Sequence, residues 1–537
     1  MNNTQIKQFI EDGHLTVGIE FGSTRIKAIA IDDQCQTLAT GSFEWENSYR
    51  NGYWTYSMND AWVGIQKAYG AMTQELKDKY DATVKQLASL GISGMMHGYL
   101  PFDDNDDLLV PFRTWRNNNA NKAAEILRED FQVNIPERWS IAQLYQSALD
   151  QEAHVEKVRY MTTLAGYIHW YLTDEKVLGI GDASGMFPID SETQDYRDDI
   201  IQRFNKKFSE KGYTQDVSDI LPKVVVAGEY AGRLTETGAK LVDPNGELQA
   251  GCPLCAPEAD AATGMVATNS VAPRTGNISA GTSIFSMIVL EKPIKDVYPE
   301  VDIVTTPDGY EVAMIHANNC TSDINAWVDL FGEVFETMGV KYDKGELFTK
   351  LFERALKGDE DLGKLLSYGY ISGEFITDVQ HGYPMLVRSV DSNFNLANLM
   401  KTHIYSAFST LKIGIDLLKE RENIHIDSMF GHGGIFKTEK VAQSFLAAAL
   451  DSPVRVMQTA SEGGAWGIAV LARYMIETKT SNLATYLNDF AFKGTESMTI
   501  EPTKDEVASF EQYTERFKQG IPLERLAHEQ FHSEQSK

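Results

Sequence analysis

The segment that most limits the fold is Leu15–Asp32, near the beginning of the chain. Two short runs of β-branched and other apolar residues flank a tight turn made of Gly22, Ser23 and Thr24. Apolar runs of this length around a glycine turn predict a β-hairpin. Gly22 lets the backbone bend close to a ligand, and the two hydroxyl residues add hydrogen-bond donors at the bend.

Charged residues surround the same turn. Glu20 precedes it, and Arg25 and Lys27 follow it. A metal-bound polyphosphate requires this combination of residues. Its oxygens accept hydrogen bonds and pair with cationic side chains, while a carboxylate helps to coordinate the Mg²⁺ ion. An N-terminal hairpin with an ordinary surface turn is the alternative interpretation.

The same pattern returns in the second half of the chain. Residues 276–290 again contain a strand, a turn of Gly281, Thr282 and Ser283, and a second strand. Two hydroxyl-rich hairpins, one opening each half, form a weak internal repeat. They predict a two-domain clamp in which each domain supplies one phosphate-holding hairpin and a nucleotide binds in the cleft between the domains.

Length and composition agree with a cytoplasmic protein of two large domains. The chain of 537 residues is too long for one core. Its net charge of −27 argues against nucleic-acid and anionic-membrane partners, which need basic patches. The polar N-terminus is unlike a signal peptide, and no apolar run is long enough to cross a bilayer. Four cysteines are too few for a disulfide framework and indicate a reducing compartment. Cys252 and Cys255 have no second pair and no histidine at a zinc-like spacing, so they are interpreted as buried small hydrophobes.

Apolar periodicity predicts helices in both halves of the chain. The predicted helices cover residues 61–90, 120–128, 141–172, 261–267, 320–338, 347–366, 394–421 and 441–450. The predicted domains are residues 1–275 and 276–476, followed by a helical appendage with a polar tail at residues 477–537.

A glycine-punctuated strand, Leu90–Asp103, contains Met96 and His97. Glycines around a histidine at the end of a strand suit the lip of a pocket, where the imidazole can bond a substrate hydroxyl. A histidine satisfied within the fold is the alternative.

Trp115, Arg116 and Asn117 combine an aromatic ring with polar groups. These residue types suit a polyol, whose C–H faces stack on rings while its hydroxyls take hydrogen bonds. The aromatic-rich residues 41–62 admit two interpretations, core packing and stacking on a sugar.

Two acidic residues are candidates for the reacting site. Asp182 lies in a glycine-rich loop, where it either contacts substrate or caps the backbone beside Gly181. Asp260 precedes a predicted helix of small residues. The dipole of this helix favours the ionised form of the carboxyl group, which can then act as a base that accepts a hydroxyl proton. A plain N-cap is the alternative for Asp260.

Strand, glycine loop and helix follow one another at residues 426–450. The loop contains Gly433, Gly434 and Lys437. Missing side chains in such a loop let a flat base or a ribose approach the backbone. This loop is the predicted adenosine site.

The order of these motifs resembles that of the FGGY carbohydrate kinases, members of the sugar kinase, actin and heat-shock ATPase superfamily. The resemblance runs from about Leu15 to Tyr474 and rests on six motifs in the family's order. These motifs are Gly18–Thr24, Gly94–Gly98, Gly181–Gly185, Glu258–Asp260, Ser279–Ser283 and Gly433–Gly434.

The resemblance implies an α/β fold with two ribonuclease-H-like domains, of the actin and hexokinase ATPase type, that close over ATP and a sugar. It implies that Asp260 is the catalytic base and that Mg²⁺ is held through Glu20 and water, although the family usually has Asp at this position. The implied nucleotide contacts are Gly22, Ser23, Thr24, Lys27, Gly281, Thr282, Ser283, Gly433, Gly434 and Lys437.

Met96 and His97 match the stretch that contacts the ketose in the xylulokinases of this family. The expected function is ATP-dependent phosphorylation of the terminal hydroxyl of a ketopentose, with D-xylulose as the first candidate. Two alternatives remain open: a kinase for L-ribulose or another ketose or polyol, and a non-catalytic ATP-binding sugar sensor. Assembly as a homodimer is also left open.

Overall fold

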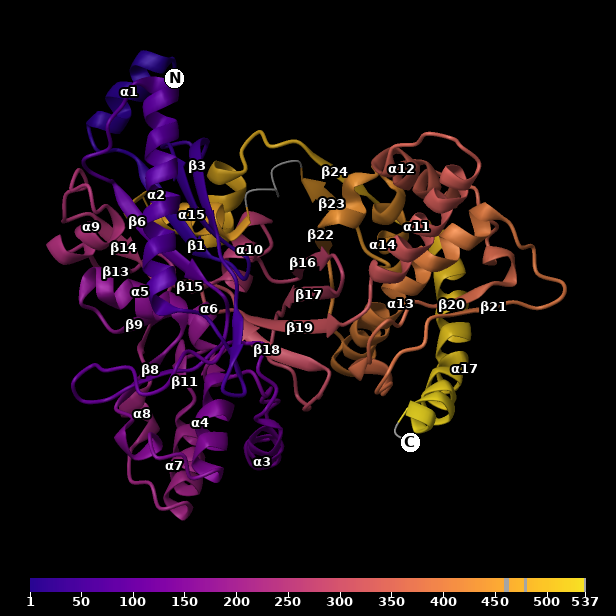
Figure 1. Ribbon diagram of the computed structural model, residues 1–537, viewed down its shortest axis with the longest axis horizontal. Coiled ribbons are helices and arrows are strands. Elements are labelled where there is room, and N and C mark those ends of the chain that lie inside the picture. Colours follow the sequence, from indigo (N-terminus) through magenta and orange to yellow (C-terminus); the bar gives the residue numbers. More distant parts are fainter. Residues whose placement is uncertain (458–462, 478–480, 536–537) are drawn as a thin grey trace. The chain divides into compact units, whose positions relative to one another are not determined.

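The computed structural model describes residues 1–457, 463–477 and 481–535 of the chain. The chain forms two compact units (Figure 1). The first unit consists of Met1–Val271, Asp302–Val312 and Ala460–Gly494, and the second of Ala272–Val301, Ala313–Thr459 and Thr495–Lys537. The chain therefore passes between the units several times.

The first unit is built on a mixed sheet around β1 (Thr16–Phe21). This strand runs antiparallel to β2 (Arg25–Ile31) and parallel to β6 (Ser89–Gly94). The strand order is β13-β14-β6-β1-β2-β3, and β15 also pairs with β6. The other strands of the sheet are β3 (Thr37–Glu44), β13 (Tyr230–Arg233), β14 (Pro253–Cys255) and β15 (Glu258–Ala259). The predicted hairpin at Gly22 is confirmed.

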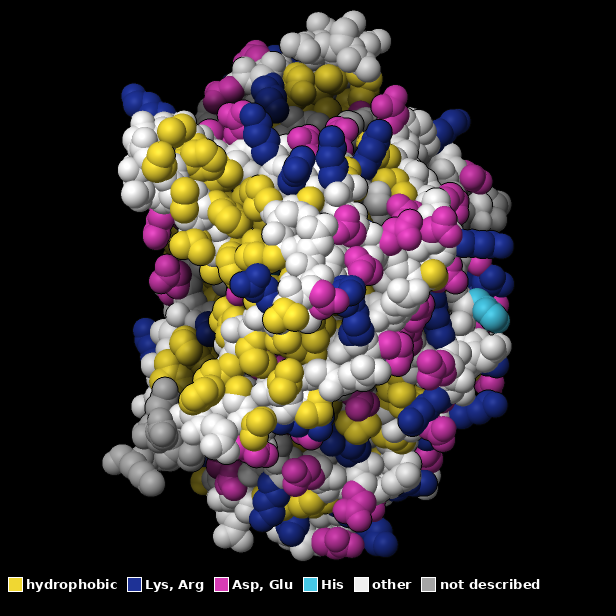
Figure 2. All heavy atoms as spheres, turned by 90° about the vertical axis from the view of Figure 1, so that its right-hand side faces the viewer, with side chains coloured by type: hydrophobic (Ala, Val, Ile, Leu, Met, Phe, Trp, Pro, Cys, Tyr) yellow, Lys and Arg dark blue, Asp and Glu magenta, His cyan; other side chains and the backbone are white. Residues whose placement is uncertain are grey.

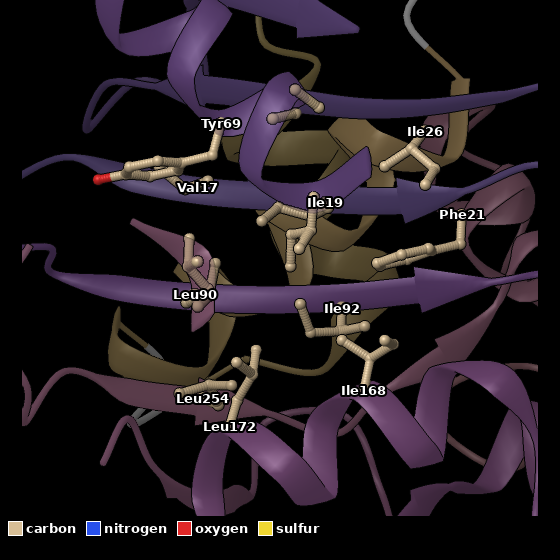
Figure 3. Close-up of a cluster of buried hydrophobic side chains, with 14 of the residues drawn as sticks. Val17, Ile19, Phe21, Ile26, Tyr69, Leu90, Ile92, Ile168, Leu172 and Leu254 are labelled. Carbon is tan, nitrogen blue, oxygen red and sulfur yellow. The ribbon is translucent and has the colours of Figure 1, made fainter. Parts of the chain in front are cut away.

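The two faces of β1 pack differently, because successive side chains of a strand point to opposite sides. Apolar side chains of β1 lie in a large buried cluster with residues of α2 (Met58–Tyr80) (Figure 3). On the other face, Gly18 allows close approach of α15 (Gly463–Glu477), since a Cβ at Gly18 would lie 2.2 Å from the Ala465 carbonyl oxygen. Glu20 lies on this second face.

The remaining elements of the first unit surround this sheet. Its helices include α1 (Asn3–Glu11), α3 (Asn121–Phe131), α4 (Ser140–Leu149), α5 (Leu164–Thr173), α6 (Ile180–Ala183), α7 (Asp198–Glu210), α8 (Val217–Ile220), α9 (Glu236–Val242), α10 (Asp260–Ala267) and α16 (Leu483–Tyr486). Short strand pairs are β4 (Ser48–Arg50) with β5 (Tyr53–Thr55), β7 (Leu100–Phe102) with β8 (Tyr160–Thr162), β9 (Val177–Gly179) with β12 (Lys223–Val225), and β10 (Ile189–Asp190) with β11 (Asp195–Tyr196).

The second unit repeats the strand order of the first. Its central strand β16 (Thr275–Ala280) is antiparallel to β17 (Ile284–Val289) and parallel to β22 (Ser428–His432). The order β19-β17-β16-β22-β23-β24 corresponds to β3-β2-β1-β6-β14-β13 of the first unit. The outer strands are β19 (Glu311–Ala317), β23 (Val454–Met457) and β24 (Ser497–Ile500), and β18 (Val301–Thr305) leads from the second unit into the first. The predicted repeat is confirmed.

The helices of the second unit include a long C-terminal helix. They are α11 (Ser322–Thr337), α12 (Lys344–Ala355), α13 (Leu396–Glu422), α14 (Val441–Leu450) and α17 (Lys504–Gln535). The C-terminal segment is not an appendage as expected, because β24 extends the sheet through β23. Phe510, Tyr513 and Phe517 of α17 are also fully buried. Because these three rings follow helical spacing, they lie on one face of α17, and this face is buried.

Several helices begin or end at residues other than the predicted ones. The helix expected to continue to residue 90 ends at Tyr80, because Asp81 adopts the left-handed conformation that terminates helices. The region 141–172 is two helices, α4 and α5, with β8 between them. The helix expected over 347–366 ends at Ala355, and Leu366 begins β20 (Leu366–Tyr368), which pairs with β21 (Met385–Val387).

The four cysteines are free and buried, as predicted for Cys252 and Cys255. Burial raises the pKa of the Cys252 thiol to about 12, so this thiol stays protonated. In the part of the chain that the structure describes, no helix combines the length and apolar character needed to span a bilayer.

Hydrophobic side chains gather on the face of the molecule shown in Figure 2. The second unit has exposed apolar residues at α11: Leu330 and Val334 lie on the helix, and Met338 is its C-cap. Exposed apolar patches are typical of interaction sites. Assembly as a homodimer stays a prediction.

Candidate active site

Asp260 begins α10 directly after β15, whose partner strand β6 leads to Met96. Its Oδ1 accepts hydrogen bonds from the backbone N–H of Met96 at 3.1 Å and of Ala261 at 2.9 Å. The N-cap is Ala259, so Asp260 does not cap α10 in the ordinary way. Burial raises the pKa of the carboxyl group, and the hydrogen bonds oppose this shift. The structure therefore places a partly buried carboxylate at the carboxyl end of two parallel strands, β6 and β15.

Glu20, at the end of β1, is electrostatically coupled to Asp260. Its Oε2 accepts a hydrogen bond from the Ala465 N–H at 3.2 Å, near the beginning of α15. Burial, followed by the charge of Asp260, raises the pKa of Glu20 to about 7, while Lys27 lowers it. A bound cation would relieve the repulsion between these two carboxylates.

The described residues contain no group of three or more His, Cys, Asp or Glu that could hold a metal ion by themselves. Magnesium is usually bound through one or two carboxylates, substrate phosphates and water. The Glu20 carboxylate fits this kind of binding, in which water and phosphate would supply the other ligands.

His97 lies close to the Met96 N–H that bonds Asp260, and it has a positive φ of 68°. Its Nδ1 is 3.0 Å from the Gly185 carbonyl oxygen. Burial, helped by the charge of Arg138, lowers the pKa of His97 to about 3. The imidazole is therefore neutral, Nδ1–H donates to the Gly185 carbonyl oxygen, and the lone pair of Nε2 can accept a hydrogen bond from a hydroxyl group.

Arg138 and Trp139 belong to the surroundings of His97, and sequence reasoning did not identify them. The Trp139 ring stacks near the imidazole, with ring centroids 6.3 Å apart and planes inclined by 23°. Trp139 is buried, and within the described chain its Nε1 has no hydrogen-bond partner. Arg138 forms an ion pair with Asp302. No short motif marked these two residues, since they precede α4 without glycine or charge patterning.

The Trp115–Asn117 prediction is only partly compatible with the structure. The Asn117 side chain is buried, and its amide exchanges hydrogen bonds with Trp54 N at 2.8 Å and Trp54 O at 2.9 Å. The Asn117 amide therefore has partners within the fold, and a sugar contact of this residue stays a prediction. Arg116 stacks on the Trp54 ring at 4.0 Å, and Trp115 is exposed.

Asp182 lies in α6 and is completely buried. Its Oδ2 accepts a hydrogen bond from Thr163 Oγ1 at 2.6 Å, and burial raises the pKa of the carboxyl to about 8. The Asp182 N–H bonds Glu258 Oε2 at 2.9 Å, so a neighbouring acid caps α6. The other carboxylate oxygen, Oδ1, is buried and has no hydrogen-bond partner among the described residues, so the contact of Asp182 with substrate stays a prediction.

The turn of the first hairpin has its carbonyls fixed by aromatic side chains. Trp45 Nε1 donates to Gly22 O at 2.7 Å, and Tyr56 OH donates to Ser23 O at 2.6 Å. The C=O and N–H of one trans peptide point in opposite directions. The N–H groups of Ser23 and Thr24 therefore point away from Trp45 and Tyr56. The aromatic residues in 41–62 thus support the turn.

The second hairpin uses the same arrangement with different donors. Thr321 Oγ1 donates to Gly281 O at 2.8 Å, and the Cys320 N–H donates to Thr282 O at 2.9 Å. By the same peptide geometry, the N–H groups of Thr282 and Ser283 point away from the 320–321 segment. Each unit therefore presents two consecutive N–H groups at a hydroxyl-rich turn, which suits phosphate oxygens.

A pocket of about 480 Å³ lies in the second unit beside this hairpin. Gly281, Gly434 and Lys437 line it, together with Thr321, Asn325 and Phe348. Gly433 has a φ of 115°, and a Cβ there would lie 2.1 Å from the Ala280 carbonyl oxygen, so only glycine fits. The structure thus brings three of the predicted nucleotide-binding residues to one pocket of suitable size.

Comparison with solved structures identifies the class of fold. The structure superposes on gluconate kinase from Lactobacillus acidophilus with a TM-score of 0.78 and 15% identity, covering 96% of this chain and 100% of the other. The ligand-bound xylulose kinase from the same species gives a TM-score of 0.77 and 14% identity, covering 97% and 99% of the two chains. The chain therefore has the two-domain fold of sugar kinases.

Sequence comparison identifies the family. The model for the N-terminal domain of the FGGY family of carbohydrate kinases matches residues 15–266, and that for its C-terminal domain matches residues 276–476. The xylulose kinase of Haemophilus influenzae is 20% identical over 419 residues, which are 75% of this chain and 80% of that protein. The protein belongs to the FGGY family of carbohydrate kinases and is a phosphotransferase.

Proposed function

We propose that the protein transfers the γ-phosphoryl group of ATP to the terminal hydroxyl of a ketopentose, with D-xylulose as the first candidate. The observation that carries this proposal is the pairing of the partly buried Asp260 carboxylate with the neutral imidazole of His97. The Met96 N–H orients Asp260, and the adjacent His97 offers Nε2 as a hydrogen-bond acceptor. A base and a hydroxyl-binding group therefore stand next to each other in the first unit.

In the proposed reaction, the Asp260 carboxylate takes the proton of the acceptor hydroxyl as its oxygen attacks the γ-phosphorus. The bond between this phosphorus and the bridging oxygen breaks, and ADP leaves. Raising the pKa of Asp260 by burial makes it a better proton acceptor than an exposed carboxylate. His97 and Trp139 hold the sugar, and Met96 contributes through its backbone N–H to Asp260.

The nucleotide is assigned to the pocket of the second unit, with Gly433, Gly434 and Lys437 at the adenosine end. The hairpin N–H groups of both units are proposed to bind phosphate oxygens, since phosphoryl transfer depends mainly on alignment and charge neutralisation. A Mg²⁺ ion bound with the nucleotide would supply positive charge at the phosphoryl oxygens. Glu20 is the residue that would hold it, through water.

A coupled ADP-release assay over a panel of acceptors tests the proposal. The panel contains D-xylulose, L-ribulose, glycerol and gluconate. We expect the highest kcat/KM for a ketopentose. Gluconate is included because the Arg138 guanidinium lies near His97, although Asp302 already pairs with it. ADP release that no acceptor increases would contradict the proposal and favour a non-catalytic sugar sensor.

We expect His97→Ala to raise the KM for the sugar about ten- to hundredfold, because a buried hydroxyl would lose its acceptor. The KM for ATP should stay within about twofold, since His97 is not part of the nucleotide pocket. Steady-state kinetics with each substrate varied in turn measures both constants. The control is His169→Ala, which removes another buried histidine whose Nε2 bonds Ala231 O. Equal changes in both KM values would contradict the assignment.

Tyr56→Phe should raise the KM for ATP about three- to tenfold, because the Ser23 carbonyl loses the hydroxyl that fixes the turn. The sugar KM should change little. Tyr69→Phe is the matched control, because the Tyr69 hydroxyl is buried and has no hydrogen-bond partner among the described residues. If both variants have the ATP KM of the wild type, the turn carbonyl does not need this support.

A further inference from the structure

Glu374 is an acidic residue in the second unit that the proposed reaction does not use. It precedes the short helix η3 (Phe375–Thr377) and is 1% exposed. Burial raises the pKa of its carboxyl to about 7. A buried carboxyl group outside a ligand site needs a reason, because its desolvation is unfavourable.

The Glu374 carboxyl is bonded to the segment between β19 and α11. Its Oε2 accepts hydrogen bonds from the Asn318 N–H at 2.9 Å and from Asn319 Nδ2 at 3.1 Å. The same segment is bonded to the residues just before Glu374. Asn319 Oδ1 accepts from the Ser372 N–H at 2.9 Å, and Asn318 Nδ2 donates to Gly373 O at 2.8 Å. Residues 318–319 are therefore fixed in position by residues 372–374.

The next two residues of this segment support the second hairpin. Cys320 donates its N–H to Thr282 O, and Thr321 donates its side-chain hydroxyl to Gly281 O. Because residues 318–321 are consecutive, the position of residues 318–319 determines the position of these two donors. The donors in turn determine the direction of the Thr282 and Ser283 N–H groups.

We propose that Glu374 is a positioning residue for the second hairpin, acting through Asn318 and Asn319 on the segment that orients the phosphate-binding N–H groups. The inference rests on the proposed function in that it takes this hairpin to bind nucleotide phosphates. Glu374 acts as a hydrogen-bond acceptor, and its charge is not required. Oε2 keeps its two donors whether or not the other oxygen carries a proton.

The test compares Glu374→Ala with Glu374→Gln. The alanine variant removes the acceptor and leaves the donors of residues 318–319 unpaired, so the Kd for ADP should rise about tenfold. The glutamine variant keeps a carbonyl oxygen at the same place, so its Kd should stay within about threefold of the wild type. Isothermal titration with ADP alone measures both values, and the sugar KM should be unchanged in both variants.

Glu524→Ala is the matched control. Glu524 is also buried in the second unit, its pKa is also raised to about 7, and its Oε2 accepts the Tyr383 N–H at 2.9 Å. It lies on α17 and has no bond to residues 318–321 among the described contacts. This variant should lose stability without losing ADP affinity. Asn319→Ala breaks the same connection as Glu374→Ala, and it replaces that variant if Glu374→Ala does not fold.

Three results with the variants would overturn the proposal. The first is an unchanged Kd for ADP in folded Glu374→Ala or Asn319→Ala. The second is a loss in Glu374→Gln as large as in the alanine variant, and the third is an equal loss in Glu524→Ala. A wild-type protein that binds no ADP removes the premise and also overturns it. A wild-type protein that binds ADP but phosphorylates no sugar contradicts the proposed function, while the ADP comparison still decides the role of Glu374.

Discussion

Replacing Asp260 with Asn should lower kcat about 10²- to 10⁴-fold, because the amide cannot take the proton of the acceptor hydroxyl. The affinity for ADP and the melting temperature should change little, because the amide oxygen can still accept the N–H groups of Met96 and Ala261. Quenched-flow or coupled assays at saturating sugar and ATP measure kcat, and titration with ADP measures affinity.

Asp216→Asn is the control for this substitution. Asp216 is the N-cap of α8, where it accepts the Ser218 N–H at 2.9 Å on the protein surface. The control should keep the wild-type kcat. Turnover of Asp260→Asn close to that of the wild type would show that another group is the base.

The pH dependence of kcat/KM is a second test of the role of Asp260. A base must be ionised, so kcat/KM should fall as the pH decreases through its pKa. Burial raises the pKa of Asp260, which places this decline above the usual range for an aspartate. Glu20 titrates near pH 7 and is coupled to Asp260, so the two groups determine the acidic limb together. A decline confined to the pH range of an exposed aspartate would contradict the coupling.

The second large effect concerns stability. Gly18→Ala should lower the free energy of unfolding by about 3 kcal/mol, because overpacking of a close backbone contact forces the elements apart. The added Cβ would lie 2.2 Å from the Ala465 carbonyl oxygen and 2.6 Å from the Ala469 nitrogen, so β1 and α15 must separate. Thermal and chemical denaturation measure the change.

Gly70→Ala is the matched control for Gly18→Ala. Gly70 is exposed on α2, and a Cβ there would meet no atom within 4 Å. Alanine should stabilise this helix by about 0.5–1 kcal/mol. If Gly18→Ala were as stable as Gly70→Ala, α15 would not pack against β1 closely enough to exclude a Cβ at position 18.

The sequence predicted the parts of the fold that have a strong local pattern. The hairpin at Gly22 and its repeat at Gly281 each combine two apolar strand-like runs with turn residues. Both hairpins are present in the structure, and the strand order around them is the same in the two sheets. The helix 441–450 was predicted with its observed ends, because a uniform apolar run follows the glycine loop. Such signals lie within short windows of the chain.

The features that could not be predicted from the sequence depend on contacts between residues far apart in the chain. Asn117 has the residue type of a sugar ligand, but the backbone of Trp54 satisfies its amide. Trp139 lies 42 positions after His97 and meets it only in the fold. The C-terminal segment is charged and resembles an appendage, yet three of its aromatic rings complete the core of the second unit. Local composition carries no information about these partners.

The most direct test of the central claim is the stoichiometry of the reaction followed by ³¹P NMR. Wild-type protein is incubated with ATP, Mg²⁺ and the best acceptor of the panel. We expect one phosphomonoester on the terminal carbon of the sugar for every ADP formed, and almost no inorganic phosphate. Formation of ADP with inorganic phosphate, independent of the sugar, would contradict the claim that Asp260 activates a sugar hydroxyl.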